Sequence, residues 1–406
     1  MDDRRVTGKD LLYMIFVLAL PLSWASFVVG SIYRSLSILI VMAFVFMHSG
    51  KIPLLKDKEK LRKAFFLYVL YSSLTIIWTP DQSGALKIVF GMLLILLIAY
   101  IFASYEYDER RRNIVDYCWI ITGIIAAALY LRGGAVAVGI YGSRRSLMIL
   151  GTSTDPNEFA GLFIITIPML LYHLFSEKKI GAKIVFTMLA LAEFYAVLLS
   201  GSRGALIGTI IACLITLFSA GILDFKKLIV GILAAIVIMW LIFTYLLPNI
   251  PADILRRLTI ESMLADGGSG RTTIWASGMS QWLEGNPLKW FIGYGVDGIQ
   301  AVGERGVGGT LHNTILQQIA NYGLIGLFLF LSILWNAYKE IRTNNPRYLG
   351  AFFGMLLMSL TLSMGPAYKP LWILLMMGFV VDHSGEESME NDGKEIFYYN
   401  NRYRER

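Results

Sequence analysis

The sequence offers little material for a metal site or for disulfide bonds. It contains two cysteines and four histidines among 406 residues. Cys118 and Cys213 both fall inside apolar runs, where a free thiol packs as a small hydrophobic group. Paired cysteines and an H-E-x-x-H motif are both lacking. We therefore expect a function that needs neither a metal ion nor another cofactor.

Charged residues are also scarce, at 16% of the chain, whereas hydrophobic residues make up 56% and the mean hydropathy is +0.60. This balance is typical of integral membrane proteins. The net charge of +7 comes mostly from basic residues beside apolar runs, so it indicates orientation in a membrane and not nucleic-acid binding. The glycine-rich segments lack the G-x-x-x-x-G-K-[ST] pattern and are not a nucleotide P-loop.

Twelve apolar runs approach the roughly 20 residues that a helix needs to cross the hydrocarbon core. They show no strict alternation, which excludes the strands of a membrane barrel. The first run lacks a small-x-small cleavage site, so we interpret it as a retained span. The sequence predicts an all-α integral membrane protein of about twelve transmembrane helices. Their approximate cores are 11–29, 36–48, 64–78, 85–103, 114–131, 159–175, 184–199, 205–222, 228–247, 314–335, 349–364 and 371–381.

Basic residues predict the orientation of these spans. Most of the 36 lysines and arginines gather in alternate connecting segments, and such segments face the cytoplasm. Both termini are therefore expected inside, in a multi-pass protein of the cytoplasmic membrane. The predicted organisation is a polytopic membrane domain over 1–384, with a large external loop over 248–313 between spans nine and ten. A polar cytoplasmic tail follows over 385–406.

Some basic residues fall on the predicted external side, against this bias. Positive charge at the outer ends of spans indicates an anionic ligand there. The alternative is that each side chain is solvated or reaches along the bilayer surface by itself. The residues are Arg34, Arg132, Arg144, Arg145, Arg203, Arg256, Arg257, Arg271, Lys289, Arg305 and Lys369.

The first local pattern is the predicted external turn that opens the eighth span, LLSGSRGALIG. Gly201 and Gly204 allow a ligand to approach the backbone, and a helix start supplies N–H donors for an anion. Arg203 adds a planar fork that matches phosphate oxygens. The alternative is an interfacial cap with an arginine that reaches the headgroups.

The second pattern lies in the external loop and reads GGSGRTTIWASGMSQWLEGNPLKWFIGYGVDG. Trp275, Met279 and Trp282 recur at i, i+4 and i+7, which predicts an amphipathic helix whose apolar face lies on the membrane domain. Arg271 would stand at the start of this helix, after a glycine-rich turn.

The third pattern is His312-Asn313, where the external loop enters the tenth span. His48, His173 and His383 map to cytoplasmic span ends, so only His312 is predicted outside. It is a candidate general base, although an ordinary structural histidine accounts for the same residue.

Taken in order, these motifs resemble the O-antigen ligase and polymerase family over about residues 151–327. The segment STDPNEFAGLFI at the sixth span resembles a further motif of that family. The motifs are Ser202-Arg203-Gly204, Gly270-Arg271 followed by Ile274-Trp275, Gly293-x-Gly295, His312-Asn313, and Gly323-Leu324-Ile325-Gly326.

The resemblance implies a membrane glycosyltransferase with a GT-C-like fold of twelve spans. Its donor would be a polyprenyl-diphosphate-linked glycan, and its acceptor a hydroxyl of a glycan, of lipid A core or of a protein. By the resemblance, Arg203 and Arg271 hold the diphosphate and His312 activates the acceptor hydroxyl. The transfer would be metal-independent and would invert the anomeric carbon. Supporting roles would fall to Ser202, Gly204, Asn313 and Asn157.

Two questions stay open at this point. A lipid-linked oligosaccharide flippase could also have twelve spans and bind diphosphate. A flippase should carry charged residues along an inner path, whereas these spans hold few charged residues. A polymerase of surface polysaccharide and a ligase that moves finished glycan to an acceptor are not separated by any residue. The external loop shows no evident carboxylate pair, which argues against a glycosidase.

Overall fold

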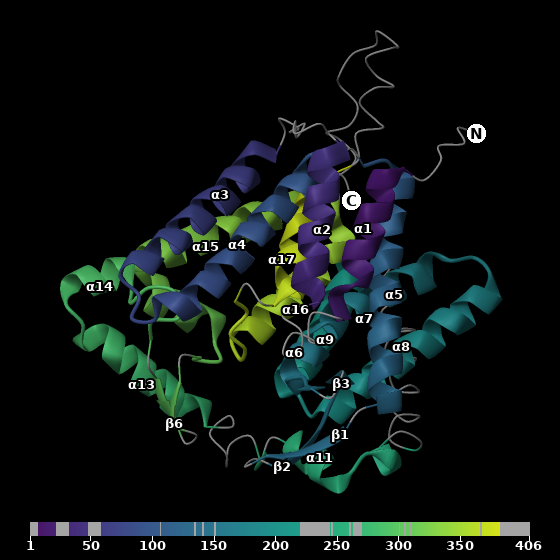
Figure 1. The fold of residues 1–406 in the computed structure, drawn as a ribbon. Coiled ribbons are helices and arrows are strands. Elements are labelled where there is room, and N and C mark those ends of the chain that lie inside the picture. Colours follow the sequence, from purple (N-terminus) through teal and green to yellow (C-terminus); the bar gives the residue numbers. More distant parts are fainter. Residues whose placement is uncertain are drawn as a thin grey trace, which may run out of the picture.

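The computed structural model places most of the chain in helices that run between two ends of one bundle (Figure 1). Predictions for the ninth span over 228–247 and for the tail over 385–406 fall almost wholly outside the residues that it describes. The described residues are 7–21, 32–47, 58–105, 107–133, 135–139, 142–149, 152–219, 244, 247–259, 261–262, 270–299, 301–303, 306–308, 310–365 and 368–381.

Among the described residues, five helices are long and apolar enough to cross a bilayer. Each coincides with a predicted span, so an all-α, multi-pass membrane protein is confirmed, while the number twelve stays a prediction. These helices are α4 (Gln82–Ala103), α5 (Glu109–Gly133), the continuous α6 (Pro156–Gly161) and α7 (Phe163–Ser176), α8 (Ile180–Ser200) and α15 (Thr314–Asn344).

Shorter helices complete the bundle, and three of them differ from the predicted spans. The first, α1 (Gly8–Leu18), ends inside the span predicted over 11–29. The span predicted over 349–364 is helical only to Ser359, because the next residues turn away to bind the start of α15. The last predicted span is an eight-residue helix extended by one 3-10 turn, η7 (Met377–Phe379). The shorter helices are α1 (Gly8–Leu18), α2 (Ile32–Met47), α3 (Glu59–Leu74), α9 (Arg203–Ser219), α16 (Leu349–Ser359) and α17 (Lys369–Met376).

Glycines bring α9 and α16 into close contact at the centre of the bundle. A Cβ atom added to Gly208 would lie 2.8 Å from the carbonyl oxygen of Gly354, so neither residue has room for a side chain. Small residues at a helix interface let two backbones approach, which favours association inside a membrane. This contact positions the start of α9, where Arg203 lies.

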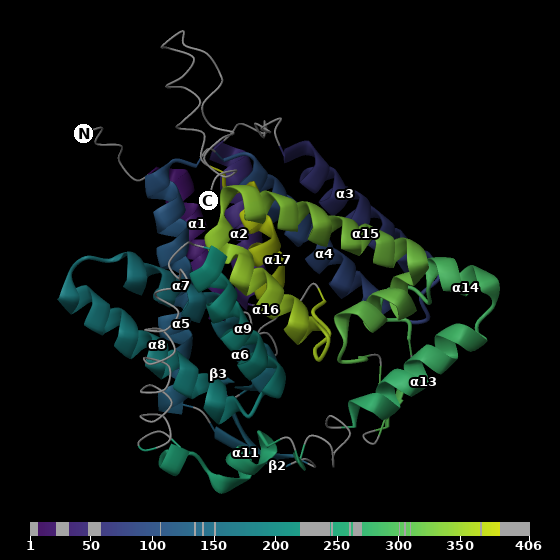
Figure 2. The same cartoon turned by 180° about the vertical axis from the view of Figure 1, so that it is seen from behind.

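One end of the bundle carries elements that no apolar run predicted. The start of α1 and the end of α17 lie at the opposite end, as both views show (Figures 1 and 2). We call the end that carries these elements the loop end. It holds the antiparallel hairpins β1 (Ala135–Gly139) with β2 (Gly142–Ser146), β3 (Met148–Ile149) with β4 (Thr152–Ser153) and β5 (Ala301–Gly303) with β6 (Gly306–Gly308), and the helices α11 (Ala252–Arg257), α13 (Arg271–Glu284) and α14 (Pro287–Ile292).

A buried ion pair ties three parts of the chain together away from the loop end. Asp116 of α5 has no exposed surface, and its Oδ2 lies 3.0 Å from Nη1 of Arg347 and 3.3 Å from Nε2 of His173. The hydroxyl of Tyr348 donates to Oδ1 of the same carboxylate at 2.6 Å. Because its partners come from α7 and from the turn η6 (Pro346–Tyr348), the carboxylate fixes α5 and these two segments relative to one another.

Replacing Asp116 by alanine should lower the free energy of unfolding by about 3–5 kcal/mol, because Arg347 then stays buried without its carboxylate. Denaturant titration of the purified protein in micelles, followed by circular dichroism, measures this change. The matched control is Glu59→Ala, which removes an exposed i,i+4 pair with Lys63 and should change stability little. Equal stability of Asp116→Ala and the wild type would show that the buried pair does not hold the bundle.

Candidate functional site

Arg203 is the first residue of α9, at the turn that the sequence predicted. Gly201 ends α8 in the left-handed conformation, with φ of 60°, and the chain reverses there into α9. Nε of Arg203 donates to the carbonyl oxygen of Arg257 at 2.6 Å, and Nη2 donates to the hydroxyl of Ser262 at 2.7 Å. The arginine therefore holds the segment of α11 over the start of α9.

Two further arginines reach the same turn. Nε of Arg257 donates to the carbonyl oxygen of Gly201 at 3.3 Å, and the side chain of Arg257 is buried. Nη2 of Arg144, from strand β2, donates to Oδ1 of Asn157 at 2.6 Å, and its Nε donates to the carbonyl oxygen of Ser200 at 3.4 Å. We call Arg144, Arg203 and Arg257 the arginine cluster.

The acceptors in these bonds are carbonyl, hydroxyl and amide oxygens, which carry no formal charge. These bonds orient the three guanidinium groups at the turn. The sequence placed Arg144 and Arg257 among the external basic residues but did not assign them to the site. The position of Arg144 depends on the pairing of β2 with β1, which sets Arg144 opposite Ala137 and which the sequence did not predict.

Asn157 enters the site because α6 begins one residue before it. The carboxylate of Asp155 caps this helix and accepts hydrogen bonds from the N–H groups of Asn157 at 2.7 Å and Glu158 at 3.3 Å. Pro156 occupies the first helical position, where its missing N–H costs nothing. The motif over 153–164 therefore builds a helix start beside the arginine cluster.

His312 lies at a second helix start, directly before α15. Its φ is 50°, a left-handed conformation that few residues other than glycine adopt. Both peptide groups of the preceding Leu311 are fixed, since its N–H donates to Oε1 of Gln317 and its carbonyl accepts from Nε1 of Trp275, each at 2.8 Å. These contacts hold the partly buried imidazole at the start of α15.

Asn313 caps α15 and links it to the segment that follows α16. Its Oδ1 accepts from the N–H of Leu316 at 3.1 Å, and its Nδ2 donates to the carbonyl oxygen of Leu360 at 3.0 Å. The backbone N–H of Asn313 donates to the hydroxyl of Ser363 at 3.2 Å. Thr314 donates to the carbonyl of Leu362 at 2.7 Å. Residues 360–364 are thus bound along the start of α15.

The same segment also contacts the start of α9. A Cβ atom at Gly204 would collide with the hydroxyl of Thr361, so the glycine makes room for this segment. Ser202 is buried, and its hydroxyl accepts from the N–H of Ala205 at 3.4 Å, which completes the turn. Residues 360–364 therefore lie between the arginine cluster and His312. One short segment thus contacts both Gly204, next to Arg203, and Asn313, next to His312.

Arg271 begins α13, the amphipathic helix that the sequence predicted. Ile274, Trp275 and Met279 pack around Ile299, Leu311 and Ala320, so the apolar face lies on the start of α15 and the loop before it. In both views α13 stands apart from α9 and α11 (Figures 1 and 2). The helix α13 itself packs on α14, α15 and β5.

The helix α15 is broken at Gly323, and the external loop binds to the break. Gly323 has φ of 66° and ψ of −167°, so the helical hydrogen bonds of the preceding turn are lost. The N–H groups of Tyr294 and Gly295 donate to the carbonyls of Ala320 and Asn321, at 3.0 and 2.8 Å. Inside a membrane protein such freed carbonyls need partners.

Two glycines make this contact possible. A Cβ atom at Gly293 would collide with the carbonyl of Asn321, and one at Gly323 would collide with the carbonyl of Phe291. The hydroxyl of Tyr71 donates to the carbonyl of Tyr322 at 2.9 Å. The Gly293-x-Gly295 and Gly323 motifs thus have a structural role, which is to fix the loop against α15.

The loop continues onto the end of α3. The hydroxyl of Thr79 donates to the carbonyl of Val296 at 2.7 Å, and the N–H of Val296 donates to the hydroxyl of Thr75 at 3.0 Å. Burial, with the nearby carboxylate of Asp81, raises the pKa of Asp297 above its usual range. We call residues 291–297 the docked segment.

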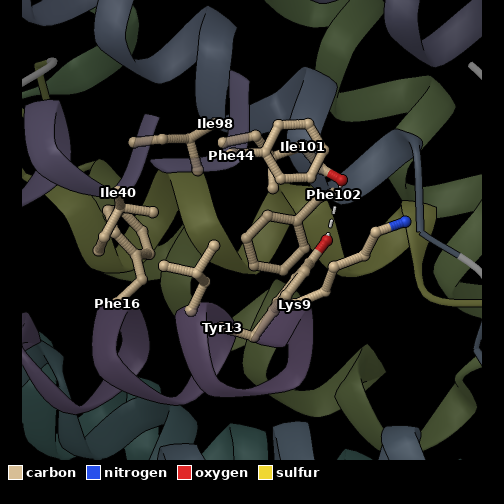
Figure 3. A pocket seen from close by; sticks show the side chains of 9 residues that line it. Lys9, Tyr13, Phe16, Ile40, Phe44, Ile98, Ile101 and Phe102 are labelled. Atoms are coloured by element: carbon tan, nitrogen blue, oxygen red, sulfur yellow. Dashed lines mark hydrogen bonds between the residues drawn. The ribbon is translucent and has the colours of Figure 1, made fainter. Parts of the chain in front are cut away.

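A pocket between α1, α2 and α4 is unrelated to these residues (Figure 3). Its only polar groups are the ammonium of Lys9 and the hydroxyl of Tyr13, which donates to the carbonyl of Ile101 at 3.0 Å. The described residues contain no group of three His, Cys, Asp or Glu side chains that could hold a metal ion. Among the described residues, the arginine cluster brings three basic side chains to one turn of the loop end.

Residues 185–331 match the family model of the O-antigen ligase domain (Wzy_C). This segment of the chain is similar to an O-antigen ligase domain. It runs from α8 into α15 and includes Arg203, Arg257, Arg271 and His312. The resemblance read from the motifs is confirmed. Such a domain indicates transfer of a lipid-linked glycan.

A search of curated proteins found no match. Among solved structures, the chain is similar to one described as "Structural coordination of polymerization and crosslinking by a peptidoglycan synthase complex". The TM-score is 0.48 at 16% sequence identity, and the alignment covers 79% of this chain and 96% of the other.

Gly323→Ala should release the docked segment, because the added Cβ meets the carbonyl of Phe291 and the left-handed φ becomes strained. We expect hydrogen exchange of the peptide that contains Tyr294 and Gly295 to accelerate about tenfold or more, measured by mass spectrometry. The matched control is Gly181→Ala in α8, where a Cβ meets nothing within 4 Å. Unchanged exchange in Gly323→Ala would mean that the break does not depend on glycine.

Proposed function

We propose that this protein transfers a glycan from a polyprenyl-diphosphate carrier to an acceptor hydroxyl at the external face of the cytoplasmic membrane. The observation that carries the proposal is the convergence of Arg144, Arg203 and Arg257 on the turn that opens α9, where the O-antigen ligase domain begins its second helix. Asn157 orients one of the three guanidinium groups. Three permanent positive charges at one helix start suit a diphosphate.

The arginine cluster would supply most of the catalysis by binding the leaving group. As the glycosidic bond breaks, negative charge grows on the diphosphate, and guanidinium groups already in place stabilise it without rearrangement. Each charge-assisted hydrogen bond of this kind contributes about 1.5–3 kcal/mol. No strong acid is then needed, because diphosphate departs as a stable anion. Arg271 would bind the donor from the other side of the loop end.

His312 would act as the general base. A neutral imidazole takes the proton of the acceptor hydroxyl as that oxygen attacks the anomeric carbon from the face opposite the diphosphate, so the configuration inverts. A positioned base of this kind accelerates transfer by about 10² to 10⁴. The fixed peptide groups of Leu311 and the cap at Asn313 support this role, because they hold the imidazole at one place.

For the membrane topology, we propose twelve spans with both termini in the cytoplasm and the loop end outside. The start of α1 and the end of α17 lie together, and the loop end lies opposite to them (Figure 1). The basic residues near the termini favour the cytoplasm for the first of these ends.

Single cysteines test this topology in a variant whose Cys118 and Cys213 are replaced by serine. Ala252→Cys in α11 should react with a membrane-impermeant thiol reagent in intact cells, and Lys179→Cys before α8 should react only after the membrane is opened. Both positions are exposed, so access to the reagent depends on the side of the membrane alone. The reverse labelling pattern would place the site in the cytoplasm and rule out the proposed reaction.

One observation favours transport as a second candidate function. Discontinuous helices such as α15, with its break at Gly323, are common where transporters bind substrate. In this chain, however, the carbonyls at the break are bound by the docked segment and by Tyr71, so they do not face an open path.

Reconstitution separates these functions. Purified protein in vesicles, given only polyprenyl-diphosphate repeat units, should form a ladder of longer lipid-linked glycans if it is a polymerase. A ligase should stay silent until a core lipid or an acceptor protein is added. Movement of labelled donor across the bilayer with no transfer under either condition would replace the proposed function by transport.

The variants sharpen this experiment. Arg203→Lys and Arg271→Lys should each reduce transfer strongly, because one ammonium does not reproduce a bidentate guanidinium. His312→Ala should bind the donor as tightly as the wild type does, but its transfer rate should fall by a factor of about 10² to 10⁴. Lys289→Ala, which removes a cation of the short helix α14, is the matched control and should transfer normally. Normal transfer by His312→Ala would remove the base from the mechanism.

A further inference from the structure

Tyr368 carries a buried hydroxyl that the proposed chemistry does not use. The residue lies between α16 and α17 and is 3% exposed. Within the described part of the chain, its hydroxyl makes no hydrogen bond. A buried hydroxyl without a partner costs free energy, so it is retained only where something offsets that cost. Its position indicates what the partner is.

The hydroxyl of Tyr368 lies against α6. A Cβ atom at Gly161 would collide with it, so the glycine leaves the space that the hydroxyl occupies. Glu158 stands three residues earlier on the same helix, and residues at i and i+3 share a face. The carboxyl group of Glu158 is partly buried, and no described residue donates a hydrogen bond to it. A phenol and a carboxyl group, both with unused bonding capacity, therefore share one face of α6.

The start of α6, which carries Glu158, adjoins the arginine cluster. Asn157, the neighbour of Glu158, binds the guanidinium of Arg144 at 2.6 Å. In a diphosphate-linked glycan the first sugar is joined to the phosphate itself. A diphosphate bound by the arginine cluster therefore brings the hydroxyls of that sugar to the start of α6. Sugar hydroxyls donate to a carboxylate and accept from a phenol. The two groups match the part of the donor that the arginines leave unbound.

We propose that Glu158 and Tyr368 form a subsite for the first sugar of the diphosphate-linked donor. The subsite rests on the proposed function, because the arginine cluster must hold the diphosphate for the sugar to reach it. Glu158 accepts from a sugar hydroxyl and Tyr368 donates to one. The pair selects donors by the hydroxyls that their first sugar presents, whereas the arginines bind any polyprenyl diphosphate.

The test compares two ligands in equilibrium titrations of the purified full-length protein in nanodiscs. One ligand is the glycan-carrying donor, and the other is polyprenyl diphosphate without sugar. Tyr368→Phe should bind the donor about tenfold more weakly and the sugar-free ligand as the wild type does, because only one hydroxyl is removed. The variant should melt at the wild-type temperature or above it, since that hydroxyl has no partner in the protein.

Glu158→Gln gives a second test, in which the affinities for the two ligands should change in different directions. It should weaken donor binding, yet leave the sugar-free ligand unchanged or bound more tightly, because it removes a negative charge near the diphosphate. Arg203→Lys should weaken both ligands. The matched control is Tyr107→Phe, which removes a buried tyrosine hydroxyl far from the loop end and should leave both affinities unchanged.

Two results would overturn the subsite. Wild-type donor affinity in both Tyr368→Phe and Glu158→Gln would mean that neither group contacts sugar, and an equal loss for both ligands in Tyr368→Phe would mean a structural role. The proposed function fails separately, when the wild type binds the donor but transfers nothing in reconstituted vesicles. In that case the variants' affinities for the donor and for the sugar-free ligand still show whether Glu158 and Tyr368 bind the sugar. Binding of neither ligand by the wild type would overturn both proposals.

Discussion

The arrangement of the loop end depends on two backbone hydrogen bonds, from the N–H groups of Tyr294 and Gly295 to carbonyls at the break in α15. Hydrocarbon offers no partner to a carbonyl that a helix has released, so the break exists only while the docked segment covers it. The same contact fixes the short first half of α15. That half carries His312 and Asn313 at its start, and α13 packs on it through Trp275.

The candidate site is built from helix starts and not from one continuous element. The starts of α6 and α9 meet at the arginine cluster, and the start of α15 meets them through residues 360–364. Helix starts present N–H donors and a positive dipole end, so their meeting adds to the charge of the arginines. The segment 360–364 is therefore as important for the geometry of the site as the arginines are for its charge.

The sequence predicted the features that follow from a single helix. Bilayer thickness sets the length of a span, so all five long helices were found, and the period of Trp275 and Met279 revealed α13. Features that depend on pairing were missed. The residues of β2 are polar and show no alternation, so the position of Arg144 follows only from its partner strand. The early end of α16 at Ser359 likewise reflects contacts with α15, and the unpaired hydroxyl of Tyr368 leaves no pattern in the sequence.

The buried carboxylate of Asp116 has a consequence for how the chain is made. Tyr348, one of its partners, lies 232 residues further along the chain, and Arg347 directly precedes it. At about 5–20 residues per second, synthesis reaches these partners roughly ten to fifty seconds after α5 emerges. His173 arrives earlier, 57 residues on, and is the first partner that the carboxylate can meet. Helix α5 therefore enters the membrane with an acid whose counter-ion does not yet exist. The full set of bonds to this carboxylate is completed only when the second half of the protein has been made.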